Sequence, residues 1–82
     1  MAAAYKVFGV TIPQNNGYAQ APSEVTVRVI PHLKQVEPYA ELEHVSGNRW
    51  KLTTPHFGAE MVARVLQEHY GFQTAEEGEV VK

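Results

Sequence analysis

Five prolines divide this chain into short segments, and they constrain its fold more than any other residue type does. They stand at Pro13, Pro22, Pro31, Pro38 and Pro55. A proline has no backbone N–H and a fixed φ, so it ends strands and is tolerated in a helix mainly in the first turn. The chain is therefore expected to fold from several short elements, whose type is indicated by the period of their apolar residues.

Alternating apolar residues predict two strands, over residues 4–12 and 24–30. Each stretch places three apolar side chains two residues apart and runs up to a proline: Phe8, Val10 and Ile12 in the first, and Val25, Val27 and Val29 in the second. In the second stretch polar residues fill the intervening positions, which is typical of an antiparallel strand with one solvated face. The stretch from His32 to Glu37 is predicted to hold one helical turn or a loop.

Residues 39–54 are predicted to form a hairpin around Ser46-Gly47-Asn48. A two-residue loop would mix charged and apolar side chains on one face, whereas a three-residue loop separates them. The three-residue loop gives these cross-strand pairs: Ala40 with Thr54, Leu42 with Leu52, Glu43 with Lys51, His44 with Trp50, and Val45 with Arg49. Because a slip of one residue moves every side chain to the other face, the three-residue loop is the predicted register.

Residues 55–70 are predicted to form a helix. Apolar and aromatic residues recur there at helical spacing: Phe57, Met61, Val62, Val65, Leu66, His69 and Tyr70. Pro55 suits the first helical position, where its missing N–H costs nothing. Gly71 suits the position after the last turn, with Phe72 folding back on Leu66.

These elements predict a single α+β domain over residues 1–82. Its expected fold is a four-stranded, mostly antiparallel sheet with one C-terminal helix on one face, in the order β-β-β-β-α. Residues 73–82 are expected either to form a flexible acidic tail or to add a short edge strand through Val80-Val81.

Composition excludes several chemistries. The chain has 82 residues, 7 Lys and Arg against 9 Glu, and no cysteine, so it lacks both a disulfide framework and thiolate chemistry. No Gly-rich phosphate loop and no spaced His-Glu metal motif occurs. We therefore expect no enzymatic activity, cofactor or metal. No apolar run is long enough to span a bilayer, and Met1 to Lys6 do not form a signal peptide, so a cytoplasmic setting is expected.

Protein binding is the function that remains. The polar loop 13–23 is longer than most connections and carries one aromatic residue, Tyr18. We expect partner contacts from Asn16, Tyr18 and Gln20 in this loop, and from Arg28, Arg49 and Lys51 on the exposed sheet face. For Tyr18 the alternative is that it folds back onto its own loop.

Two other functions remain as alternatives. The first is a sheet that binds single-stranded nucleic acid, which the acidic balance and the absence of a helix between the first two strands disfavour. The second is a structural homo-oligomer, for example a homodimer that covers leftover apolar surface. In size and build the chain is similar to small acidic accessory proteins, including phage-encoded inhibitors of host machinery. That similarity covers no motif and transfers no functional residue.

Overall fold

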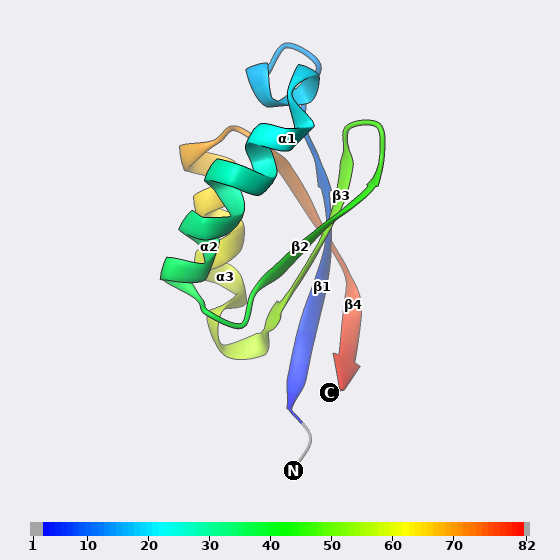
Figure 1. Cartoon of the computed structure of the whole chain (residues 1–82). Coiled ribbons are helices and arrows are strands. Elements are labelled where there is room, and N and C mark those ends of the chain that lie inside the picture. The colour runs from blue at the N-terminus through cyan, green and yellow to red at the C-terminus, as the bar shows by residue number, and fades with distance from the viewer. Residues whose placement is uncertain (1–2, 82) are drawn as a thin grey trace.

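A four-stranded antiparallel sheet forms one layer of the molecule, and two helical rods cover one of its faces (Figure 1). The computed structural model describes residues 3–81. The predictions about the N-terminal segment and the C-terminal tail also involve Met1, Ala2 and Lys82, which lie outside the described residues. The sheet order is β2-β3-β1-β4. Its strands are β1 (Ala4–Thr11), β2 (Glu41–Ser46), β3 (Arg49–Pro55) and β4 (Gln73–Val81).

Each rod is a continuous helical segment that includes one π-helical turn, which is wider than an α-helical turn. The first rod consists of α1 (Pro22–Glu24), the π-turn η2 (Val25–Val29) and α2 (Ile30–Val36). The second consists of the 3₁₀ turn η3 (His56–Gly58), α3 (Ala59–Arg64) and the π-turn η4 (Val65–His69). The element order is therefore β-α-β-β-α-β, the split βαβ arrangement of ferredoxin-like folds. The α+β class and the four-stranded sheet are confirmed, but the order β-β-β-β-α with one helix is wrong.

The stretch 24–30 is helical because its burial has a period of four and not two. Val25, Val29 and Leu33 are at most 1% exposed and face the sheet, whereas Val27 between them is 67% exposed. Pro31 does not end the element. A proline within a helix clashes with the carbonyl four residues before it. The π-turn immediately before Pro31, in which Ile30 N–H donates to the Val25 carbonyl, widens the backbone there and accommodates the ring.

The predicted hairpin register is confirmed over its central pairs, but the turn differs. Leu42 pairs with Leu52, Glu43 with Lys51 and His44 with Trp50. Ser46, and not Val45, then pairs with Arg49, because the register shifts between His44 and Ser46. The bulge at Val45 lets a two-residue turn with Gly47 at φ 52° coexist with the register that the side-chain pattern requires.

The predicted helix over 55–70 is present as the second rod, and its C-terminal end has the expected form. Its start differs, because Pro55 is the last residue of β3 and caps η3, so it does not occupy the first helical position. Gly71 has φ 73°, and the backbone N–H groups of Gly71 and Phe72 donate to the carbonyls of Gln67 and Leu66. Its N-terminal apolar residues do not face the core, however. Phe57 is 99% exposed and Met61 63% exposed, because Phe57 lies on the 3₁₀ turn and the core-facing stripe begins at Ala59.

The core lies between the sheet and the rods, and Trp50 is buried in it as predicted. The other side, called here the open sheet face, carries alternate residues of the two central strands: Tyr5, Val7, Gly9 and Thr11 on β1, and Arg49, Lys51 and Thr53 on β3. Arg28, expected on that face, lies on the first rod instead. No helix within residues 3–81 is long and apolar enough to cross a membrane.

Candidate functional site

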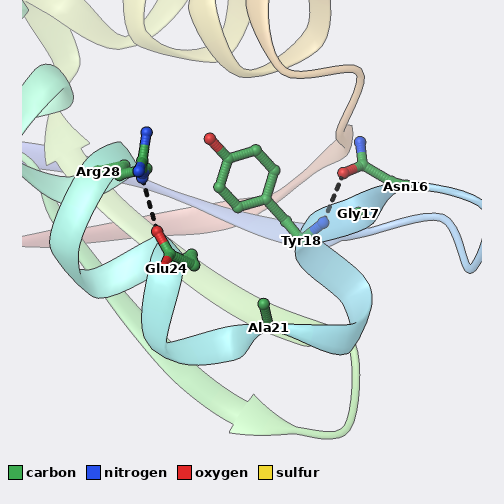
Figure 2. Close-up of a pocket in the computed structure, with 6 residues that line it drawn as sticks. All are labelled: Asn16, Gly17, Tyr18, Ala21, Glu24 and Arg28. Atoms are coloured by element: carbon green, nitrogen blue, oxygen red, sulfur yellow. Dashed lines mark hydrogen bonds and ion pairs between the residues drawn. The ribbon is translucent and has the colours of Figure 1, made fainter.

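A hollow of about 360 Å³ lies where the polar loop meets the first rod (Figure 2). We call it the Tyr18 hollow. Its lining comes from the loop, from the 3₁₀ turn η1 (Gly17–Gln20) and from the first rod: Asn16, Gly17, Tyr18, Ala21, Glu24 and Arg28. Three of the six residues predicted to contact a partner, Asn16, Tyr18 and Arg28, are therefore brought together, although Arg28 arrives on a helix and not on a strand.

Asn16 fixes the loop through both polar atoms of its side-chain amide. Its Oδ1 accepts a hydrogen bond from the Tyr18 backbone N–H at 2.9 Å, which caps η1. Its Nδ2 donates to the Tyr70 carbonyl at 2.7 Å, at the end of the second rod. The loop is thus tied to an element far away in sequence, so the hollow has a defined shape before any partner arrives.

Tyr18 packs against other elements and not merely onto its own loop. Its ring centroid lies 5.7 Å from those of Tyr70 and Phe72, in edge-to-face geometry. The side chain remains partly exposed and lines the hollow. Tyr18 therefore has a structural contribution in addition to any contact with a partner.

Arg28 and Glu24 supply opposite charges at the side of the hollow. Arg28 Nε lies 2.6 Å from a Glu24 carboxylate oxygen, and the two side chains are 69% and 45% exposed. Such an exposed i,i+4 pair contributes only a few tenths of a kcal/mol to stability. Little free energy is therefore lost when a partner group takes the place of either member.

The other three predicted contact residues lie elsewhere. Gln20 is exposed and donates from Nε2 to the Gln14 carbonyl at 3.2 Å, but it does not line the hollow. Arg49 and Lys51 lie on the open sheet face and line a groove of about 400 Å³. The Glu77 side chain also lines that groove and lies over Gly9, so an acidic group accompanies the two cations.

Sequence analysis missed Glu24 because it assigned residues 24–30 to a strand, and it missed Ala21 because a small apolar residue in the loop 13–23 carries no signal of its own. On a strand, Glu24 and Arg28 are four residues apart with no contact. On a helix, the same spacing places them on one face, and this i,i+4 signal was available in the sequence.

A cluster of His32, His69 and Tyr70 joins the two rods near the hollow. His32 Nδ1 lies 2.6 Å from the Tyr70 hydroxyl, and the two imidazole rings are 5.1 Å apart between centroids. Burial, and then the neighbouring Tyr18, raise the pKa of Tyr70 above its usual value of 10.0. Within the described residues, no three His, Cys, Asp or Glu side chains gather in a way that would hold a metal ion.

Comparison of the chain with protein-family models, with curated proteins and with solved structures finds no match.

Proposed function

We propose that this protein is a small non-enzymatic protein-binding module of the cytoplasm that acts sterically, as an inhibitor or adaptor of a larger protein or complex. The observation that carries this proposal is the Tyr18 hollow, in which Tyr18 and Arg28 line one preformed depression. Tyrosine and arginine are the residue types that, with tryptophan, dominate the binding energy of protein interfaces.

The chemistry of the hollow suits a polar peptide segment. The Tyr18 ring offers an apolar contact surface at low entropic cost. The Arg28 guanidinium carries several N–H donors, and only Nε is engaged with Glu24 at hydrogen-bonding distance. A partner carboxylate or backbone carbonyl would complete the fork, with Tyr18 packing against the adjacent side chain.

Arg28→Ala tests this proposal better than a change at Tyr18, because Tyr18 also packs against Tyr70 and Phe72. The second rod offers a matched control: Arg64 forms the same kind of exposed i,i+4 pair, with Glu68 at 3.4 Å. A partner is first recovered from nuclease-treated lysate by affinity capture, and its dissociation constant is then measured with each variant.

We expect Arg28→Ala to weaken binding about 10-fold or more, as the loss of an interface arginine does. Arg64→Ala is expected to leave the dissociation constant unchanged, and both variants should melt close to the original protein. Equal affinity for Arg28→Ala and the original protein would remove the Tyr18 hollow from the interface.

The second candidate function is binding of single-stranded nucleic acid by the sheet, and the structure removes one objection to it. A helix does stand between the first two strands, so the β-α-β-β-α-β order that RNA-recognition modules require is present. The composition of the open sheet face speaks against it. Tyr5 is the single aromatic residue on this face in the described central strands, and Glu41, Glu43 and Glu77 accompany Arg49 and Lys51.

Titration of a labelled single-stranded oligonucleotide at low and moderate salt separates the two functions. Nucleic-acid binding would appear as an affinity that falls steeply with added salt. We expect no saturable binding at either salt concentration. Tight, salt-dependent binding that is lost in Lys51→Glu would move the proposal to nucleic acid.

A further inference from the structure

Two histidines from different rods lie next to each other where the rods run side by side (Figure 1). His32 belongs to α2 and His69 to η4, and we call them the histidine pair. The centroids of their imidazole rings are 5.1 Å apart. The Tyr70 ring contacts both histidines, with centroid distances of 5.7 Å to His32 and 4.8 Å to His69.

The spacing of the histidine pair equals that of two imidazoles bound to one metal ion. A zinc–nitrogen bond is about 2.0–2.1 Å long, so two imidazoles on one tetrahedral ion have centroids about 5 Å apart. The observed spacing therefore requires no movement of the rods. His69 is exposed and His32 is partly exposed, so an ion from solvent can reach both rings. Packed aromatic rings can have a similar spacing, but the hydrogen bond of His32 favours a metal ligand.

Tyr70 already makes the hydrogen bond that a metal-bound histidine needs. In metal sites one ring nitrogen binds the ion, while the other donates to an oxygen atom, which fixes the tautomer and the orientation of the ring. His32 Nδ1 lies 2.6 Å from the Tyr70 hydroxyl, so Nε2 is the nitrogen left for an ion. The pKa of Tyr70 is raised, first by burial, so its hydroxyl stays neutral and can accept the Nδ1–H.

We propose that His32 and His69 together bind one divalent transition-metal ion of the kind that prefers imidazole, such as Zn²⁺, through one ring nitrogen each. Imidazole is a good ligand for Zn²⁺, Cu²⁺ and Ni²⁺, whereas Mg²⁺ and Ca²⁺ prefer oxygen. Within residues 3–81 no third His, Cys, Asp or Glu joins the pair, so water or a group from a partner takes the remaining positions. The affinity is therefore expected to be lower than that of a closed four-ligand zinc site.

The position of the pair predicts what the ion does to the molecule. Its two ligands come from different rods, so the unfolded chain does not hold them together. An ion that binds only the folded chain stabilises it, and the melting temperature then depends on the ion concentration. The sequence gave no signal for this pair, because metal motifs are recognised by the spacing of ligands within one segment.

Titration with Zn²⁺ at about pH 7.5 tests the proposal, followed by calorimetry and by thermal unfolding. We expect one ion per chain, and a melting temperature that rises with Zn²⁺ and returns to its original value with a chelator. His32→Gln and His69→Gln should each abolish nearly the whole response, because the two side chains share one ion. His56→Gln, at an exposed histidine beside Glu79, is the control and should retain the response.

Two comparisons separate a lost ligand from a lost fold. Because His69 is exposed, His69→Gln should melt like the original protein when Zn²⁺ is absent. Tyr70→Phe keeps both histidines and the ring but removes the hydroxyl that positions His32. It is expected to weaken Zn²⁺ binding about 10- to 100-fold, as the loss of such a positioning hydrogen bond does. The dissociation constant is measured well below the melting temperature, so it reports on folded protein.

Four results would overturn the proposal. They are the absence of a Zn²⁺ response at 1 mM, a full response in His69→Gln, a half-response in each single histidine variant, and an unchanged affinity in Tyr70→Phe. The half-responses would mean that each histidine binds an ion by itself. Neither histidine lines the Tyr18 hollow, and Arg28→Ala should leave the Zn²⁺ response intact. Failure of the metal site is therefore distinct from failure of the proposed partner binding.

Discussion

Among single residues, Tyr70 links the two rods to the Tyr18 hollow. Its hydroxyl lies 2.6 Å from His32 Nδ1, its carbonyl accepts from Asn16, and its ring contacts Tyr18. Nothing in the sequence indicates these contacts, because they join residues up to 54 positions apart. Spacing along one segment predicts neighbours within that segment, whereas contacts between elements depend on how the elements pack.

The raised pKa of Tyr70 predicts a specific loss of stability in alkali. The folded protein holds this proton more tightly than the unfolded chain does, so the contribution is fully present below the unfolded pKa near 10. It is lost as the pH rises through the folded pKa of Tyr70. Denaturant unfolding between pH 8 and 12 should therefore show a smaller decline for Tyr70→Phe than for the original protein. Tyr39→Phe, at a tyrosine that is 69% exposed, should retain the full decline; a Tyr70→Phe curve parallel to the original would contradict the prediction.

Among the elements, local signals were sufficient for the second rod and misleading for the first. The helix over 55–70 could be predicted because Pro55 and Gly71 mark its ends. The helix over 24–30 could not be predicted in this way. Its three valines are spaced two residues apart, as in a strand, but Val25 and Val29 are also four residues apart, as on one face of a helix. Burial against the sheet decides between a period of two and a period of four. Leu33, beyond Pro31, is also buried and continues the period of four that is typical of a helix. The bulge at Val45 could not be predicted either. It leaves unchanged the alternation of polar and apolar side chains from which the hairpin register was predicted.

The end of the second rod depends on the backbone conformation of Gly71. At φ 73° a Cβ is strained, even though the nearest atom to it, Asn16 Nδ2, would lie at an ordinary 3.6 Å. Gly71→Ala is therefore expected to destabilise the protein by about 1 kcal/mol. Gly17→Ala is the control, because its φ is not in the left-handed region and no atom lies within 4 Å of the added Cβ. Denaturant unfolding should show no loss for Gly17→Ala; equal losses would mean that the φ of Gly71 is not the cause.

At the scale of the whole molecule, the two layers depend on a small core. A domain of this length is stabilised by roughly 4–12 kcal/mol in total. Trp50, which is 5% exposed on a central strand, is part of the core, and its ring lies beside that of His44 with centroids 4.8 Å apart. One large buried side chain is therefore a considerable share of what keeps the chain folded.

Trp50→Ala should remove about 3–5 kcal/mol of the free energy of unfolding, through lost burial and the cavity left behind. Phe57→Ala removes another aromatic ring, but one that is 99% exposed, and should cost almost nothing. Thermal unfolding of the two variants compares them directly. A small loss for Trp50→Ala would mean that the rods and the sheet are held together by other contacts.

The neighbouring positions of β1 and β4 have a consequence for the connectivity of the chain. Ala4 pairs with Val81, so the two ends of the described chain lie on adjacent strands at one end of the sheet (Figure 1). A peptide of a few residues would join them, and new termini would open between Ser46 and Gly47, which are both exposed, so that Asn48 keeps its backbone and side-chain hydrogen bonds with Ile12. Such a circular permutant would keep every strand pair of the sheet except those beside the opened turn. Fusion tags would then extend from the Gly47-Asn48 turn, at the end of the sheet opposite to Ala4 and Val81.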